Sequence, residues 1–324
     1  MTERTAGPGH DVTMGPLRVM FHRTVRVAEG RRPANLPPSL GYLPLYRVAD
    51  YPGKCPDVWE QGGFFVPLHD REATWLSFWT FEPVALLVGA GGINALTGKP
   101  LGTKLEKDGY LVTPPQPWLD GWKSPHGTVY QFVAAPYEAG KGVTVGEQIL
   151  GDKSVSGGLG LALFRAKDPS SLKPYHKPHE LWGGDPYGPT PHQSFIGGAF
   201  HGGKMKMAAS MPTAHVFSAS VQHRTSFKGA EMGLGKGGEI VQKVYADPHG
   251  LEAWKELPEA TMAVYLVNSV AFKEITGIDM PAPVGQEQYQ GKWFGLGDAA
   301  EKDVAGSDTF VGLHSVFAPK VEAK

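Results

Sequence analysis

Glycine and proline interrupt the chain at short intervals, and this feature limits most strongly what the sequence can fold into. The 324 residues include 43 glycines and 28 prolines, which fall almost everywhere between short runs of β-branched and aromatic residues. Glycine costs backbone entropy in a helix and proline removes a hydrogen-bond donor, whereas both are favoured in turns. The pattern therefore predicts an all-β chain whose strands are separated by turns.

Alternation of apolar and polar residues marks the first strand, between Leu17 and Val27. Further strands are predicted, in chain order, at 64–66, 74–81, 84–88, 110–113, 129–134, 159–163, 240–245, 261–267 and 310–317. The best helix candidate begins at Asp247 with a proline at its first position, and it ends before Pro258. We expect a large antiparallel β-sandwich or distorted barrel with few short helices, and the predicted core comprises Trp75, Phe78, Leu86, Val88, Phe132, Val264 and Leu266.

Composition divides the chain into four segments. Residues 1–35 are predicted to form an N-terminal arm and the first strand, 36–168 a main β block, 169–228 an insertion or lid, and 229–324 a second β block that completes the same domain. The insertion differs from the rest because it is rich in glycine, proline and histidine and poor in acids. Long loops of this kind inside a compact domain are usually functional or disordered.

The charge balance and the number of cysteines limit which partners the protein can bind and in which cellular compartment it is expected. Lysine plus arginine (31) nearly balances aspartate plus glutamate (32), so no net field favours nucleic acid. The single cysteine, Cys55, excludes an intrachain disulfide. No apolar run has the length of a membrane span, and Met1 to Asp11 lacks the order of a secretory signal. We therefore expect a cytoplasmic protein without a membrane span; the alternative is export by a route that needs no signal sequence.

Two glycine-rich runs and one charged run resemble functional motifs, but the residues around them favour simple turns. Residues 84–92 read as a strand entering a dinucleotide-binding turn, but Gly98 and Pro100 leave no room for the helix that must follow. A hairpin or β-bulge turn is favoured there, and a turn is also predicted at 233–238. The charged residues 69–72 are predicted to form a solvated turn.

The insertion concentrates side chains that can bind a metal ion. Imidazole and thioether groups suit copper, and imidazole suits zinc. The alternative is that these histidines are solvent or interface groups, because their spacing matches no defined motif. The candidate metal ligands are His176, His179, His201, His215, Met205 and Met207.

Two tryptophans flank an aspartate at a predicted turn. Trp118 and Trp122 could stack on a sugar or another ring while Asp120 accepts a hydroxyl hydrogen bond. The alternative is a sheet corner, in which Trp118 packs into the core and Asp120 closes the turn through its own backbone. Trp118, Asp120 and Trp122 are thus the candidate ligand-binding residues for a small molecule or glycan.

Several short motifs together resemble an uncharacterised all-β family of bacterial and fungal hypothetical proteins. The resemblance spans residues 36–165 and 228–324, and because no activity is established for that family it implies no catalytic residues. The histidine-rich segment departs from the family pattern. The motifs are Gly92-Ile-Asn-Ala-Leu-Thr-Gly98, Gln116-Pro-Trp-Leu-Asp-Gly121, Gln131-Phe-Val-Ala134, Met232-Gly-Leu234 with Gly237-Gly238, Asp247-Pro-His-Gly250 with Trp254, and Asn268-Ser269.

No assembled catalytic motif occurs in the sequence, including Gly-x-Ser-x-Gly, His-Glu-x-x-His and the phosphate-binding loop. The first hypothesis is a non-catalytic binding or self-assembling protein, a homo-oligomer whose aromatic turns serve as interface anchors. The second is a metal-dependent enzyme or metal-binding protein that uses copper or zinc in the insertion. The third is a carbohydrate-binding module.

Overall fold

The computed structural model describes residues 8–30, 32–137, 142–151, 157–172, 205–206, 231–283 and 302–316. Within them the chain is mostly antiparallel β-structure, which confirms the predicted all-β class. The strands are β1 (Asp11–Met14), β2 (Leu17–Thr24), β3 (Tyr46–Arg47), β4 (Phe64–Pro67), β5 (Ala73–Trp79), β6 (Val84–Ala90), β7 (Ile93–Asn94), β8 (Leu111–Thr113), β9 (Trp118–Leu119), β10 (Gly121–Lys123), β11 (Val129–Pro136), β12 (Leu159–Arg165), β13 (Met205–Lys206), β14 (Glu231–Ile240) and β15 (Ala260–Val267).

Helices are few and short in the described residues, as predicted. The two α-helices are α1 (Val145–Leu150) and α3 (Ser269–Thr276), and the longer of them has 8 residues. Both begin at capping side chains, Thr144 for α1 and Asn268 for α3. No helix in the described part of the chain is long and apolar enough to cross a membrane.

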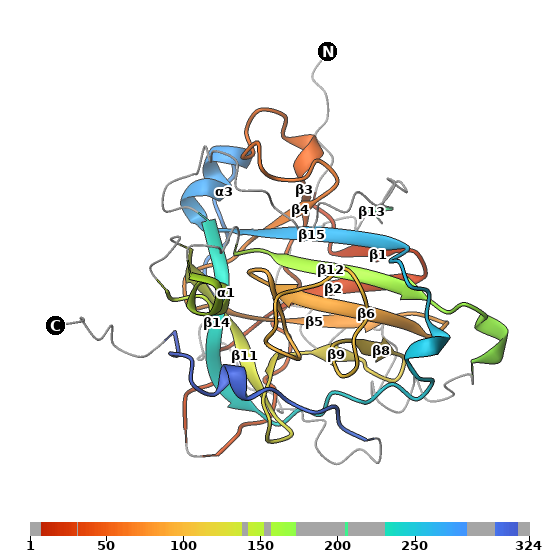
Figure 1. The fold of residues 1–324 in the computed structure, drawn as a ribbon. Helices are drawn as coiled ribbons and strands as arrows, with labels where there is room; N and C mark the ends of the chain where they lie inside the picture. Colours follow the sequence, from red (N-terminus) through yellow and green to blue (C-terminus); the bar gives the residue numbers. More distant parts are fainter. Residues whose placement is uncertain are drawn as a thin grey trace.

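All the strands belong to one 15-stranded sheet with the main order β13-β1-β2-β5-β11-β14-β15-β12-β6-β7. Among the described strands, only the pairs β1 with β13 and β4 with β15 are parallel. In Figure 1 the sheet folds over on itself: β2 and β5 lie in one layer, β15, β12 and β6 lie in the other, and β11 and β14 run steeply across one side. Among the described residues the sheet remains open, so of the two predicted architectures it matches the sandwich rather than the closed barrel.

The strand β14 links the two layers. It pairs with β15 only through its first two residues but with β11 along nearly its whole length. Its glycines allow neighbouring segments to approach closely, since a Cβ at Gly235 would lie 2.2 Å from the Val316 side chain and one at Gly238 2.6 Å from the Val27 carbonyl oxygen. The turn predicted at 233–238 is therefore wrong. The strand predicted at 240–245 is also misplaced, because β14 ends at Ile240.

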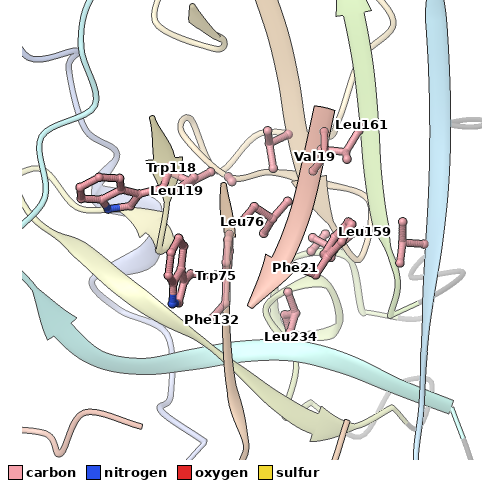
Figure 2. Close-up of a cluster of buried hydrophobic side chains, with 14 of the residues drawn as sticks. Val19, Phe21, Trp75, Leu76, Trp118, Leu119, Phe132, Leu159, Leu161 and Leu234 are labelled. Carbon is pink, nitrogen blue, oxygen red and sulfur yellow. The ribbon is translucent and has the colours of Figure 1, made fainter. Parts of the chain in front are cut away.

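Apolar side chains fill the space between the layers. Figure 2 shows Val19 and Phe21 of β2 on the side of the sheet that faces Leu159 and Leu161 of β12. Burial of apolar surface contributes about 25 cal/mol per Å² and is the main favourable term in folding. All seven predicted core residues are buried, namely Trp75, Phe78, Leu86, Val88, Phe132, Val264 and Leu266.

Two further predictions, the helix that begins at Asp247 and the strand at 310–317, need correction. The Asp247 carboxylate accepts hydrogen bonds from the Tyr110 hydroxyl at 2.6 Å and the Trp254 indole at 2.7 Å, and only a 3₁₀ turn, Leu251–Ala253, follows it. The predicted strand at 310–317 instead begins with the end of a 3₁₀ turn, Asp308–Phe310. Residues 311–316 are not in a strand, and residue 317 lies outside the described residues.

The turns at 91–92 and 69–72 differ in how well they were predicted. Gly91 and Gly92 have φ values of 57° and 78° and connect β6 to β7, which confirms the hairpin. The turn at 69–72 is only partly solvated, because Glu72 is buried and accepts a 2.9 Å hydrogen bond from Arg23 Nε. Glu72, one of the charged residues that mark this turn in the sequence, therefore belongs to a buried ion pair.

The C-terminal described segment is fastened to the sheet by a buried ion pair. Lys123 Nζ on β10 lies 2.7 Å from Asp303 Oδ2, and Asp303 Oδ1 accepts the Val244 backbone N–H at 2.9 Å. The Lys123 side chain is fully buried, whereas the Asp303 side chain keeps some exposure. Burial lowers the pKa of Lys123, and Asp303 opposes that shift. The charge of the lysine thus depends on one carboxylate.

We expect Asp303→Asn to lower the free energy of unfolding by about 2 kcal/mol, because it leaves a buried ammonium group without its counter-charge. Lys123→Met removes the charge itself and should cost less. Urea unfolding of both variants at neutral pH measures the difference. If Lys123→Met were the more damaging change, the ion pair would not be what holds this segment.

Candidate functional site

Three neighbouring strands place polar and aromatic side chains on the face of the sheet that points away from Phe21. His22 on β2 lies opposite Trp75 on β5. On the other side of β5, Ser77 lies opposite Trp118 on β9, and continuing this register places Asp120 beside Trp75. Side chains opposite each other on neighbouring strands share a face.

Tyr42 extends this arrangement through a β-bridge to His22. We call Tyr42, His22, Trp75 and Asp120 the Asp120 row. Trp118 belongs to the adjacent row on the same face, and Figure 2 shows the Trp75 and Trp118 indoles pointing away from Leu159 and Leu161. The chain thus uses one face of these strands for the core and the other for a polar and aromatic cluster.

His22 is fixed by hydrogen bonds at both ring nitrogens. Its Nε2 lies 2.7 Å from Ser77 Oγ, and its Nδ1 lies 2.9 Å from Ser39 Oγ. The Ser39 hydroxyl donates to the Gly41 carbonyl oxygen at 3.2 Å. Because a hydroxyl has one hydrogen, we assign the proton of His22 to Nδ1, so that Nε2 accepts from Ser77.

The environment of His22 favours positioning rather than catalysis. Burial lowers the pKa of His22 from 6.5 to about 3, so the ring is uncharged at neutral pH. A base with so low a pKa takes a proton from serine poorly. The imidazole stacks on the Trp75 ring with centroids 3.6 Å apart and an interplanar angle of 2°. His22 therefore fixes the orientation of the Trp75 indole.

The aromatic rings form a wall just below the surface. Trp75 packs edge-on against Trp118 with centroids 6.3 Å apart, and Tyr42 lies 4.8 Å from the His22 ring. Trp75 and Trp118 keep 7% and 9% of their area exposed, and Tyr42 is half-buried.

Asp120 is the most unusual residue of the cluster. It is 1% exposed, and neither carboxyl oxygen has a hydrogen bond of good geometry within the described part of the chain. Burial raises the pKa of Asp120 well above its usual value, and the nearby Trp118 indole opposes this only in part. The charged form of this acid therefore lacks the donors that would stabilise it.

The backbone around Asp120 is held firmly. Its N–H donates to Gln242 Oε1 at 3.0 Å, and its carbonyl oxygen accepts the Phe132 N–H at 3.0 Å. The side-chain amides of Gln116 and Gln242 both donate to the Trp118 carbonyl oxygen. These amides are thus engaged by the backbone, which leaves the Asp120 carboxyl group unpaired in a fixed position.

The Trp75 indole N–H is also without an acceptor among the residues that the structure describes. Each unpaired buried polar group costs about 1–3 kcal/mol, and nearly all such groups in proteins have a partner. The Asp120 row therefore holds a carboxyl group and an indole N–H, neither of which has a hydrogen bond of good geometry to the described residues. A water molecule or a ligand would satisfy them.

The three predicted ligand-binding residues separate in the structure. Trp118 and Asp120 lie in the cluster, but Trp122 is fully buried elsewhere, packing on Phe132 with centroids 5.2 Å apart. Its indole N–H donates to the Gly235 carbonyl oxygen at 3.3 Å. Neither indole presents a ring face to solvent, so the predicted sugar platform would require Trp118 to turn outward.

The predicted metal ligands His176, His179, His201, His215 and Met207 lie outside the described residues. Only the backbone of Met205, in β13, is described. Elsewhere in the described chain, no three histidine, cysteine, aspartate or glutamate side chains gather as a metal site would require.

Sequence reasoning missed His22, Trp75 and Ser77 as site residues. Trp75 was assigned to the core, and its burial is correct. The available signal was that Trp75, Ser77 and Trp79 alternate with Leu76 and Phe78, so β5 has two differently composed faces. That His22 lies opposite Trp75 depends on strand pairing across 53 residues.

No family model, curated protein or solved structure matches the chain. The resemblance to an uncharacterised family stays a prediction.

The buried state of His22 predicts a pH-dependent loss of stability. Below pH 6.5 the unfolded chain binds a proton at this residue and the folded chain does not, so stability falls as pH drops through the window from 6.5 to about 3. Between pH 7 and pH 5 the loss is about 2 kcal/mol. His22→Gln should lack this component in urea unfolding at both pH values.

The control is His314→Gln, which removes an exposed histidine outside the row. It should keep the pH dependence of the wild type. An unchanged dependence in His22→Gln would show that His22 is not buried as described.

Proposed function

We propose that the protein is a non-catalytic binding protein that holds a small ligand at the Asp120 row. The observation that carries this proposal is the fully buried carboxyl group of Asp120, neither oxygen of which has a hydrogen bond of good geometry in the described residues. Buried polar groups without partners are rare in folded proteins and often mark a site whose partner is a water, ion or ligand.

The surroundings of Asp120 support binding. Ligand sites combine aromatic walls with a few fixed polar groups, and the row supplies Trp75 and Trp118 as the walls. The hydrogen bonds of Gln116 and Gln242 hold the site in place before a ligand arrives. Such preorganisation lowers the entropy cost of binding.

A thermal-shift screen tests the proposal. The probes are fragments of three kinds, planar heterocycles with N–H groups, monosaccharides and alkylamines, each at millimolar concentration. At ten times its dissociation constant a ligand adds about 1.4 kcal/mol, which raises the melting temperature by about 2 °C. We expect at least one kind to do so with the wild type and none with Asp120→Asn, which replaces one carboxyl oxygen by an amide NH₂ group.

The matched control is Asp308→Asn, which makes the same change at an exposed position and should respond as the wild type does. Absence of any shift with the wild type, or an equal shift in Asp120→Asn, would refute binding at this row.

A second candidate, self-association into a homo-oligomer, is favoured by one residue. Phe81, in the turn between β5 and β6, is 88% exposed and packs edge-on against Trp79 with ring centroids 4.2 Å apart. The Arg18 guanidinium lies 6.0 Å from the Trp79 ring centroid. Aromatic residues and arginine are the side chains enriched in protein interfaces.

If Phe81 anchors a contact between copies, Phe81→Ser should shift the protein toward the monomer, raising the dimer dissociation constant by about 10-fold or more. Light scattering over a concentration series measures this. Val270→Ser replaces an exposed apolar residue on α3 and should leave the mass distribution unchanged. A wild type that is monomeric at all concentrations would contradict the self-association candidate.

Three earlier hypotheses stand beside these as proposals. They are the cytoplasmic location, the copper or zinc site in the 169–228 segment, and the carbohydrate-binding module. The first two await measurement on the whole chain, and the monosaccharides of the thermal-shift screen address the third.

A further inference from the structure

One edge of β14 is not covered by a strand over most of its length. β14 pairs with β11 along nearly its whole length, whereas its pairing with β15 ends at Met232. An uncovered strand edge carries backbone N–H and C=O groups that can pair with another extended segment. Here the segment 311–316, which runs past β11 and β14 in Figure 1, forms a parallel bridge to this edge. We call residues 311–316 the C-terminal arm.

Two side chains of the body hold the arm by its backbone. The Gln148 amide on α1 donates to the His314 carbonyl oxygen at 3.0 Å and accepts the His314 N–H at 2.7 Å. Lys236 Nζ on β14 donates to the carbonyl oxygens of Val311 and Leu313 at 3.0 and 3.1 Å. All four bonds use the backbone of the arm, so they depend on its extended shape more than on its sequence.

One side chain of the arm fills a hole in the sheet. Gly235 on β14 lies opposite Val133 on β11, which in turn lies opposite Ala73 on β5. A Cβ at Gly235 would be 2.2 Å from Val316 Cγ2, so Val316 takes the space that a side chain of β14 would need. Val316 is buried and packs in one cluster with Val133 and Ala73. The hole therefore selects a small, branched apolar side chain at this position of the arm.

The arm is attached less firmly than the chain just before it. Phe310 is fully buried and packs on Trp122 with ring centroids 5.4 Å apart. Val311, Gly312 and His314 are exposed, and a Cβ at Gly312 would meet no atom within 4 Å. Segments with few buried contacts open locally at a small part of the cost of global unfolding. This distribution of contacts favours opening of the arm while Phe310 stays in place.

We propose that β14 and α1 form a peptide-binding groove, which the C-terminal arm fills within one chain and which accepts the arm of a second copy by exchange. The second copy fits because every contact that holds the arm within one chain is available to an identical arm from another. Addition of an extended segment to a sheet edge is a recurring mode of peptide recognition, in which backbone bonds give affinity and side-chain pockets give selectivity. The contact involves neither Phe81 nor the Asp120 row.

The arm of the same chain is the main competitor for the groove. A segment tethered this closely has an effective concentration of about 1 mM. An arm from a second copy at micromolar concentration displaces it rarely, so the groove must be emptied before binding in trans is measured. Val316→Asp does this, because the hole cannot accept a charge while the residues that line it stay unchanged.

A peptide of residues 311–316, acetylated and amidated, stands for the arm of a second copy. In ligand-observed NMR titrations we expect it to bind the Val316→Asp chain at least 10-fold more tightly than the wild type, whose groove is filled. Adding Gln148→Ala to the Val316→Asp chain should weaken binding by about 10-fold, because two hydrogen bonds are lost. The matched control is Gln61→Ala, at an exposed glutamine outside the groove, which should leave the affinity unchanged.

Whole chains test the second copy as the partner, and all of them carry Phe81→Ser to remove the other candidate contact. Gly235→Ala places a methyl group where the Val316 side chain sits, so this chain has an intact arm that cannot dock in its own groove. An affinity-tagged Val316→Asp chain should retain at least 10-fold more of the untagged Gly235→Ala chain than of an untagged Val316→Asp chain. Circular dichroism melts confirm that each variant is folded.

Failure of the peptide to bind the folded Val316→Asp chain, or an affinity that Gln148→Ala leaves unchanged, would overturn the groove. Binding of the peptide without retention of the Gly235→Ala chain would overturn the second copy as its occupant. Neither result affects the proposed binding at the Asp120 row, which has its own probes and variants.

Discussion

The apolar contact between the two halves of the folded-over sheet is the interaction on which the rest of the structure depends. Val19 and Phe21 on one layer meet Leu159 and Leu161 on the other, and this contact fixes which face of each strand is internal. Because side chains alternate along a strand, the same contact forces His22 and Trp75 onto the opposite face. The candidate site is therefore a geometric consequence of the core.

Folding the sheet over requires a strand that tolerates close approach on both sides, and β14 provides it. Its glycines remove the side chains that would otherwise collide with the Val316 side chain and the Val27 carbonyl oxygen. The same strand carries the chain toward Gln242, whose amide holds the backbone of Asp120. The architecture and the site thus share one glycine-rich element.

Prediction from the sequence was most accurate where a residue pattern is compatible with only one kind of structure. Strands such as β2 and β15, with regular alternation or branched apolar runs, were found, and so was the hairpin at Gly91 and Gly92. Glycine in β14 was misread because glycine permits turns and close packing alike. At the site, Trp118 and Asp120 were predicted together because they are close in the sequence. The sequence could not show that Trp122 packs elsewhere or that His22 belongs to the site, since neighbours across a sheet come from distant parts of the chain.

The position of β15 has a consequence for how the protein is made. This strand pairs with β12, β14 and β4, yet it is the last strand of the described sheet in chain order. During synthesis the earlier strands leave the ribosome before their shared neighbour exists, so β4 and β12 wait with unpaired edges. Unpaired edges promote aggregation, and pairing between distant segments is slow. The newborn chain is thus most vulnerable until β15 has emerged from the ribosome.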